Sequence, residues 1–286
     1  MIEGLDHIAI VVRDLEAAAA AYGRLLGRTP LWLGHGEGIR EAWFQLPNTA
    51  LNLVQREGPG VLGDPAAARL EAGVEGLWAL GFAVADLEAE RTLVTRRGVR
   101  AEPVRESSTT SGSGETRTWR SCDLNPSDTG GAQIRLVAGT APRPISPPTA
   151  GEDAAVSELD HVVINTANCD RAVAVYGARI GLDLRLDRSN EAWGARQLFF
   201  RCGSAVVEFG ASLKAPVSDA PDRFGGLAWR VRDADAAQAR LAGEGFDVSE
   251  VRSGRKPGTR VFTLRSGAPS APALIIQQNA EPAGAL

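Results

Sequence analysis

An internal duplication constrains this chain more than any other feature of its sequence. The tetrapeptide Leu-Asp-His-Ile at residues 5–8 recurs as Leu-Asp-His-Val at residues 159–162, an offset of 154 residues (161 − 7). A Tyr-Gly pair at residues 22–23 recurs at residues 176–177 with the same offset. A register that is kept over about twenty residues indicates a repeated structural unit, and such repeats decide the fold before single elements are assigned.

Each half of the chain contains two smaller units with the order strand, helix and three strands. The apolar run Ile8–Val12 predicts a buried strand, and the Ala-rich segment Leu15–Leu26 predicts a helix that ends at Gly27. Asp86 and Asp233 stand where the helices of two later units need an N-cap. The strands expected in the chain are residues 8–12, 31–33, 42–46, 50–55, 77–84, 116–121, 133–137, 162–164, 182–186, 197–201, 205–209, 227–231, 259–264 and 273–277.

Four such units predict an α+β chain of two tandem domains. A length of 286 residues suits two domains of about 150 residues each. We expect the domains at residues 1–138 and 158–280, joined by a semi-rigid linker at 139–157 that holds four prolines. The Ser-, Thr- and Gly-rich segment Ser107–Glu115 is expected to be a mobile loop.

Composition excludes several classes of protein. The chain has 31 Lys+Arg against 35 Asp+Glu and no basic stripe, which argues against a nucleic-acid partner. No segment approaches the roughly 18 apolar residues of a membrane-spanning helix, and the first residues lack the pattern of an export signal, so we expect a cytoplasmic protein. Cys122, Cys169 and Cys202 are too scattered for a disulfide framework or a zinc site and are expected to be reduced thiols.

Four βαβββ units, with Leu-Asp-His opening each half and Tyr-Gly in each first helix, resemble the vicinal oxygen chelate superfamily. That group includes glyoxalase I, extradiol dioxygenases, epimerases and antibiotic-binding resistance proteins. The resemblance covers residues 5–137 and 159–278. It implies glyoxalase-like domains in which paired units form curled, cup-shaped mixed sheets of eight strands. It also implies a divalent metal, held by the first and last strands of each unit, that acts as a Lewis acid on two substrate oxygens.

Transferred position by position, the resemblance implies a metal-free first domain. His7 occupies the first ligand position, but the other three positions hold Asn52, Ala79 and Arg135. An arginine where an anion normally faces a cation argues directly against a metal.

The second domain keeps half of the implied ligand set. His161 and Glu208 occupy both positions of its first unit, whereas the second unit has Gly226 and Ile275. We expect His161 and Glu208 to converge inside the cup, either as ligands of one Zn, Ni, Mn or Fe ion or, without metal, as an acid–base pair. An iron dioxygenase is disfavoured, because a 2-His-1-carboxylate iron site needs a second histidine beside His161. The remaining histidine, His35, lies in a Gly-rich turn.

The resemblance leaves open whether units pair within each domain or across the two domains. In the crosswise arrangement, Arg135 would face Glu208, exclude a metal and anchor a substrate carboxylate. The sequence is compatible with both arrangements.

Further side chains are candidates for contact with a ligand. Trp78 and Trp229 fall near positions that lack the usual metal ligands, and indoles there suit a flat organic molecule. Gln277 lies two residues beyond Ile275 and therefore on the same strand face. The candidate substrate-binding residues are Trp229, Trp78, Arg135, Arg260 and Gln277.

Two functions follow from these observations. The first is a glyoxalase-like lyase or isomerase that acts next to a carbonyl of a small oxygenated organic molecule, with His161 and Glu208 as metal ligands or as an acid–base pair. The second is a metal-free protein that binds or sequesters an apolar small molecule in Trp-lined cups, as resistance proteins do. Both have a small-molecule ligand and no nucleic-acid or membrane partner, and both suit a monomer or a homodimer.

Overall fold

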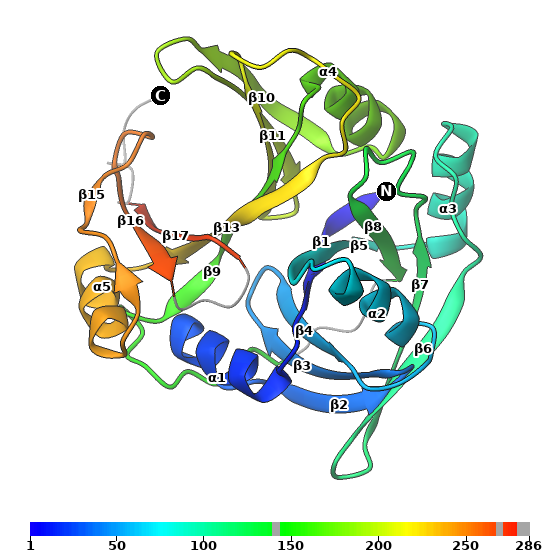
Figure 1. Ribbon diagram of the computed structural model, residues 1–286, viewed down its shortest axis with the longest axis horizontal. Coiled ribbons are helices and arrows are strands. Elements are labelled where there is room, and N and C mark those ends of the chain that lie inside the picture. Colours follow the sequence, from blue (N-terminus) through cyan, green and yellow to red (C-terminus); the bar gives the residue numbers. More distant parts are fainter. Residues whose placement is uncertain (139–143, 267–270, 279–286) are drawn as a thin grey trace.

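The computed structural model describes residues 1–138, 144–266 and 271–278, which form two strand-rich domains side by side (Figure 1). The first domain is a closed barrel with the strand order β1-β4-β3-β2-β6-β7-β8-β5. Its strands are β1 (Ile2–Val11), β2 (Trp32–Gly36), β3 (Ile39–Gln45), β4 (Ala50–Arg56), β5 (Gly76–Val84), β6 (Arg105–Ser111), β7 (Thr116–Asp123) and β8 (Gln133–Ala138). Its helices are α1 (Leu15–Leu26), α2 (Gly63–Glu71) and α3 (Leu87–Arg96).

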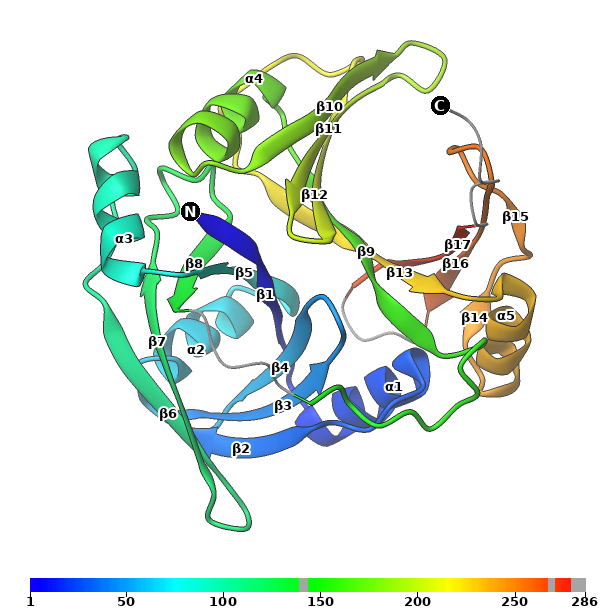
Figure 2. The same cartoon turned by 180° about the vertical axis from the view of Figure 1, so that it is seen from behind.

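The second domain is an open, curled sheet of nine strands with the order β10-β11-β12-β9-β13-β17-β16-β14, and β15 pairs with β16. In Figure 2, β10 to β12 and β15 to β17 lie on opposite sides of its concave interior. Its strands are β9 (Val156–Asn165), β10 (Asp183–Asn190), β11 (Ala195–Cys202), β12 (Ala205–Ser212), β13 (Arg223–Val231), β14 (Asp247–Val248), β15 (Arg252–Ser253), β16 (Thr259–Ser266) and β17 (Ala273–Gln278). Its helices are α4 (Cys169–Ala172), the π-helical turn η1 (Val173–Arg179) and α5 (Ala234–Gly243).

The first strand of each domain joins its two units. Strand β1 pairs with β4 of its own unit and with β5 of the next unit, and β9 pairs in the same way with β12 and β13. The units therefore pair within each domain. The crosswise arrangement, in which Arg135 faces Glu208, is wrong.

Local sequence explains why α1 begins and ends where predicted. The side chain of Asp14 accepts a hydrogen bond from the backbone N–H of Ala17 (2.9 Å), which satisfies one of the free donors of the first turn. Gly27 ends the helix in the left-handed region at φ 64°, where a side chain would be strained. Between these caps, Tyr22 and Leu25 are buried against the sheet.

One expectation about the loops is wrong, and one helix was missed. Most of the predicted loop Ser107–Glu115 belongs to β6, which pairs with β7 and extends the barrel. Ser107 and Thr109 are buried on its inner face. The strand was missed because these buried positions hold small polar residues instead of the apolar residues whose alternation indicates a strand. Helix α2 was not predicted at all.

The linker lies against the first domain where the structure describes it, from residue 144 onward. Thr29 donates its backbone N–H to Pro147 (3.0 Å), and Thr149 donates to Gly27 (2.8 Å). Residues 139–143 of the predicted linker lie outside the described residues.

The two domains share one continuous hydrophobic core. Polar contacts also cross the boundary: the Asn48 side chain bonds both backbone groups of Leu159, at 2.7 and 3.1 Å, and Tyr176 donates its hydroxyl to Thr129 (3.0 Å). The three cysteines are buried and unpaired, which agrees with the expected thiols. Among the described helices, none combines the length and apolarity that crossing a bilayer requires.

The interior of the first barrel is filled with side chains. Leu62 and Ala66, just before and within α2, form an apolar cluster with Trp78 and Val11. The space that remains inside is only about 20 Å³, room for about one water molecule. The first domain therefore has no cup that could take an organic ligand at His7.

The substitution Gly81→Ala tests how tightly this barrel is filled. A methyl group on Gly81 would lie 2.5 Å from Nδ1 of the buried His7 ring, so we expect a loss of about 1–3 kcal/mol in the free energy of unfolding, measured by urea denaturation. Gly243→Ala, with no atom within 4 Å of the added methyl, is the control and should change stability by less than about 1 kcal/mol. Equal stability of the two variants would contradict the close packing of His7.

Candidate functional site

The concave face of the second sheet encloses a cavity of about 570 Å³. Because side chains alternate between the two faces of a strand, each strand sends every second residue into it. His161 comes from β9, Gln197 from β11 and Glu208 from β12, and all three line the cavity. A volume of this size is typical of small-molecule sites.

His161 and Glu208 meet in this cavity, as their positions predicted. Nε2 of His161 lies 3.4 Å from Oε2 of Glu208. The other carboxylate oxygen accepts a hydrogen bond of 2.6 Å from Nε2 of Gln197, whose own oxygen accepts one of 3.1 Å from Arg188 on β10. The two side chains are 15% and 11% exposed, so a molecule in the cavity can reach them.

The far side of His161 is held by a carboxylate. Nδ1 of His161 lies 2.7 Å from Oδ1 of Asp160, and the other oxygen of Asp160 accepts a hydrogen bond of 2.5 Å from Nε of Arg230 on β13. Arg230 also donates to Glu158 (2.6 Å). A chain of polar contacts thus crosses five neighbouring strands, β10, β11, β12, β9 and β13, with His161 at its centre.

Asp160 is ionised in this arrangement. Burial opposes its charge, but the hydrogen bonds from His161 and Arg230 outweigh burial and lower the pKa of Asp160 to about 2. An ionised Asp160 only accepts hydrogen bonds, so we assign the proton of His161 to Nδ1. Whenever the ring is neutral, its lone pair is therefore on Nε2, the atom that faces Glu208 and the cavity.

On the β13 side of His161 the wall of the cavity is hydrocarbon. Ala228 on β13 stands beside His161 in the strand register, and it packs with Val261 and Ile276, with Leu274 alongside. These residues occupy the inward positions of the fourth unit.

The described side chains do not form a complete metal site. Nowhere in the described ranges do three His, Cys, Asp or Glu side chains gather closely enough to hold an ion. Catalytic zinc typically has three protein ligands, whereas the cavity supplies His161 and Glu208 from one side and Val261 and Leu274 from the other. The donor set does not fit the metal that the superfamily resemblance implies.

Three of the predicted ligand-contacting residues lie outside this cavity. Trp229 is fully buried in the core, because it follows the inward Ala228 by one residue. Gln277 accepts a hydrogen bond from the backbone N–H of Ala234 at the start of α5 (2.9 Å). Arg260 pairs with Asp235 on α5 (2.8 Å), on the outer face.

The other two predicted contacts belong to the filled first barrel. Trp78 packs in its apolar cluster. Arg135 is buried there and donates from Nε to Asp123 (2.7 Å). Both side chains line the small space beside His7, whereas no tryptophan is among the residues that line the second cavity.

The first barrel repeats this polar chain with acid and amide exchanged. His7 again pairs through Nδ1 with the preceding Asp6, at 2.7 Å. Asn52 stands at the register position of Glu208, and Glu41 stands at that of Gln197. Here the Asn52 amide donates a hydrogen bond to the Glu41 carboxylate (3.2 Å). With Asn52 in place of a glutamate, the Asp–His pair of the first domain lacks the second acid.

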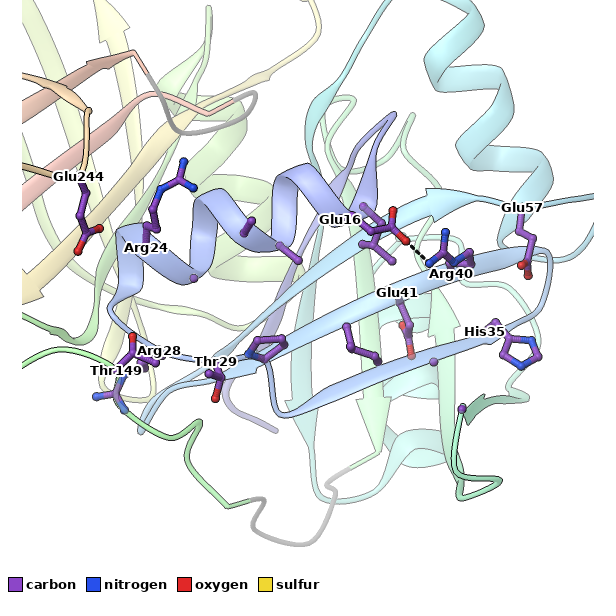
Figure 3. A pocket seen from close by; sticks show the side chains of 18 residues that line it. Glu16, Arg24, Arg28, Thr29, His35, Arg40, Glu41, Glu57, Thr149 and Glu244 are labelled. Atoms are coloured by element: carbon purple, nitrogen blue, oxygen red, sulfur yellow. Dashed lines mark hydrogen bonds and ion pairs between the residues drawn. The ribbon is translucent and has the colours of Figure 1, made fainter.

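A larger hollow, of about 1000 Å³, lies outside the barrel between α1 and β2 (Figure 3). Several of its charged side chains already have partners: Glu16 pairs with Arg40, and the Glu41 carboxylate accepts from Thr109 (2.7 Å). His35 stands at the end of the hollow away from Arg24 and Glu244. This groove is more open than the second cup and brings no acid–base pair together.

Sequence reasoning missed four polar members of the site. Asp160 was visible in the repeated Asp-His pair, and Arg230 directly follows Trp229 on the inward face. Gln197 and Arg188 depend on the cross-strand pairing of β10 with β11, where these two residues are direct partners. No sequence pattern marks such a pairing.

Comparison with known proteins gives three kinds of match. The model of the Glyoxalase/Bleomycin resistance protein/Dioxygenase superfamily matches residues 6–114 and 160–263. Ethylmalonyl-CoA/methylmalonyl-CoA epimerase of Cereibacter sphaeroides is 36% identical over 104 residues, which is 35% of this chain and 75% of that protein.

Two solved structures share the fold over nearly the whole chain. A mutant 4-hydroxymandelate synthase from Streptomyces coelicolor has a TM-score of 0.70 at 16% identity and covers 99% of this chain and 95% of its own. The Mn(II)-bound glyoxalase from Novosphingobium aromaticivorans has a TM-score of 0.64 at 13% identity, with 97% and 82% covered.

The substitution Asp160→Asn tests the charge that holds His161. Because the pKa of Asp160 is lower in the folded protein, its charge stabilises the fold above the unfolded value near 3.8, and this stabilisation is lost as the pH falls toward 2. We expect the variant to lose about 2 kcal/mol at pH 7, and about half of that at pH 3, in urea denaturation. A deficit that is independent of pH would contradict the ionised Asp160. Asp235→Asn, at an exposed ion pair, is the control and should change stability little.

Proposed function

Because the chain belongs to the glyoxalase/bleomycin resistance protein/dioxygenase superfamily, we propose that its second domain moves a proton at the carbon next to a carbonyl of a small organic anion. The observation that carries the proposal is the position of His161. Its ring is held by Asp160 at one nitrogen and presents the other nitrogen to a cavity of about 570 Å³. An Asp–His pair that opens onto a cavity is suited to general base catalysis.

The charges around the cavity favour an anionic substrate. Two carboxylates line it, Asp160 and Glu208, and both accept hydrogen bonds within the polar chain. Against these stand five cationic side chains, Arg188, Arg230, Arg252, Arg255 and Lys256. The hydrocarbon wall at Val261 and Ile276 suits a substrate with an apolar body.

In the proposed reaction, Nε2 of His161 takes a proton from the carbon next to the carbonyl. The electron pair of the broken C–H bond moves onto the carbonyl oxygen, where nearby guanidinium groups stabilise the negative charge. Asp160 stabilises the imidazolium through its hydrogen bond to Nδ1, and Glu208 faces the newly protonated Nε2. Return of the proton to carbon gives an isomer, and departure of a group from the neighbouring carbon gives an elimination.

The matched relative supports this class of reaction, since it is named an epimerase. Epimerisation next to a carbonyl consists of proton removal and return. No step is assigned to a metal, because the donor set of the second cup does not fit one. We propose that the first domain, within residues 1–138, is a structural partner of the second domain, within residues 158–280.

A second candidate function is binding without turnover. The hydrocarbon wall formed by Val261, Leu274 and Ile276 favours it, because such a surface holds the apolar part of a ligand whether or not a proton moves. A binder would take up an organic anion and return it unchanged.

Hydrogen–deuterium exchange at carbon separates the two functions. In D₂O, the protein should exchange the proton next to the carbonyl in members of a panel of small oxo acids and α-branched acyl thioesters, followed by ¹H NMR. His161→Gln should slow this exchange by about 10²–10⁴-fold, because the base is removed. His35→Gln, outside the cavity, is the control. Binding of panel members without enhanced exchange would establish the second function instead.

Metal removal gives a separate test. We expect elemental analysis of the wild type, His161→Ala and Glu208→Ala to show less than one equivalent of any transition metal, and a chelator to leave the exchange rate unchanged. One equivalent of metal that is lost in both variants would contradict the acid–base proposal and restore the metal-assisted reaction.

A further inference from the structure

A cationic hairpin forms one rim of the second cup. Residues 252–256 read Arg-Ser-Gly-Arg-Lys, and all five line the same cavity as His161 and Glu208. The segment begins as β15, which pairs with β16, and turns back into β16 at Thr259. We call residues 252–256 the rim hairpin. Figure 1 shows β15 across the concave interior from β10 and β11.

The rim hairpin is fixed in shape by Thr259. Gly254 donates its backbone N–H to Thr259 (2.9 Å), and the Thr259 backbone and hydroxyl both donate to the carbonyl of Lys256, at 3.2 and 2.5 Å. A side chain on Gly254 would collide with the Thr259 hydroxyl, so this close turn requires glycine. The three cationic side chains therefore start from a preorganised backbone.

The cations of the rim hairpin differ in their pairing from the outward cations of the adjoining strand β16. Arg260 and Arg265 on β16 are paired with Asp235 and Asp247. Within the described part of the chain, no acidic side chain pairs with Arg252, Arg255 or Lys256. The charge that faces the cavity is left available for a ligand.

The opposite rim adds a fourth cation. Arg188 lines the cavity from β10, and its Nε is buried without a hydrogen-bond acceptor. Its terminal nitrogen Nη2 donates to Gln197 (3.1 Å), which holds the guanidinium group at the cavity wall. Trp193, at the tip of the β10–β11 hairpin, lies 5.2 Å from the Arg188 guanidinium and 4.7 Å from that of Arg255. This indole therefore holds guanidinium groups from both rims beside the cavity.

We propose that the rim hairpin and Arg188 bind a phosphate group of the substrate, while its carbonyl end reaches His161 and Glu208. A phosphate offers a double negative charge and several acceptor oxygens, which suits clustered guanidinium and ammonium donors. The part of this inference that concerns the carbonyl end rests on the proposed function. The phosphate subsite itself depends only on the rim.

Isothermal titration with inorganic pyrophosphate, in a magnesium-free buffer of low ionic strength, tests the subsite on the full chain. The wild type should bind pyrophosphate, and the triple variant Arg252→Gln, Arg255→Gln, Lys256→Gln should bind at least about tenfold more weakly, because charged hydrogen bonds are lost. The matched control carries Arg260→Gln and Arg265→Gln, which remove paired outward cations, and should keep the wild-type affinity. If the triple variant does not fold, Lys256→Gln alone, at an exposed loop position, should still weaken binding about tenfold.

Three results would overturn the subsite: no pyrophosphate binding to the wild type, the same loss of affinity in the control, or equally tight binding of the tricarboxylate tricarballylate. His161→Gln should leave pyrophosphate binding unchanged, so the test is independent of the reaction. Rim-dependent binding without carbon exchange would refute the proposed reaction alone. Carbon exchange without pyrophosphate binding would refute the phosphate subsite alone.

Discussion

The ionised carboxylate of Asp160 is the interaction on which the second cup depends. It accepts hydrogen bonds from His161 on its own strand and from Arg230 on the next, so it fixes the imidazole ring and joins two strands. Burial alone would favour the neutral acid, and the two donors reverse that preference. Without this charge, nothing in the chain of contacts would decide which ring nitrogen carries the proton, and Nε2 would have no defined role toward Glu208.

The same Asp–His pair lies in a filled interior in one half of the chain and beside an open cavity in the other. In the first barrel, His7 packs edge-on against Trp43, and α2 and its preceding loop fill the remaining space. In the second sheet, Phe199 stands at the register position of Trp43, no helix corresponds to α2, and the cavity stays open. The difference between a filled barrel and an open cup therefore comes from packing, while the Asp–His pair itself is common to both.

Periodicity and the repeat predicted most of the fold and the meeting of His161 with Glu208, but they did not predict which face each strand turns inward. Trp229 was placed in the cup from its position three residues after Gly226, yet an odd spacing on a strand reverses the face. Ile275 and Gln277 share one face as expected, and that face is the outer one, because Leu274 and Ile276 line the cavity. Bulges between β9 and β13 shift the register, and no single-sequence pattern reveals them. Gln197 and Arg188 join the site only through that three-dimensional register.

Positive charge at the centre of a cup can come from an ion or from side chains. In the fourth unit, the resemblance implies ligands at the positions of Gly226 and Ile275, and the nearby inward residues Ala228 and Leu274 are hydrocarbon as well. In the proposed reaction, the enolate charge is instead met by the guanidinium group of Arg230, which bonds Asp160 beside His161. Guanidinium groups act by hydrogen bonding and charge and stabilise an enolate less than a coordinated divalent ion does, so such a site suits substrates whose C–H bond is already acidic. A substrate that also binds the rim hairpin would be positioned by groups remote from its reacting carbon. His161 alone cannot position the substrate in this way.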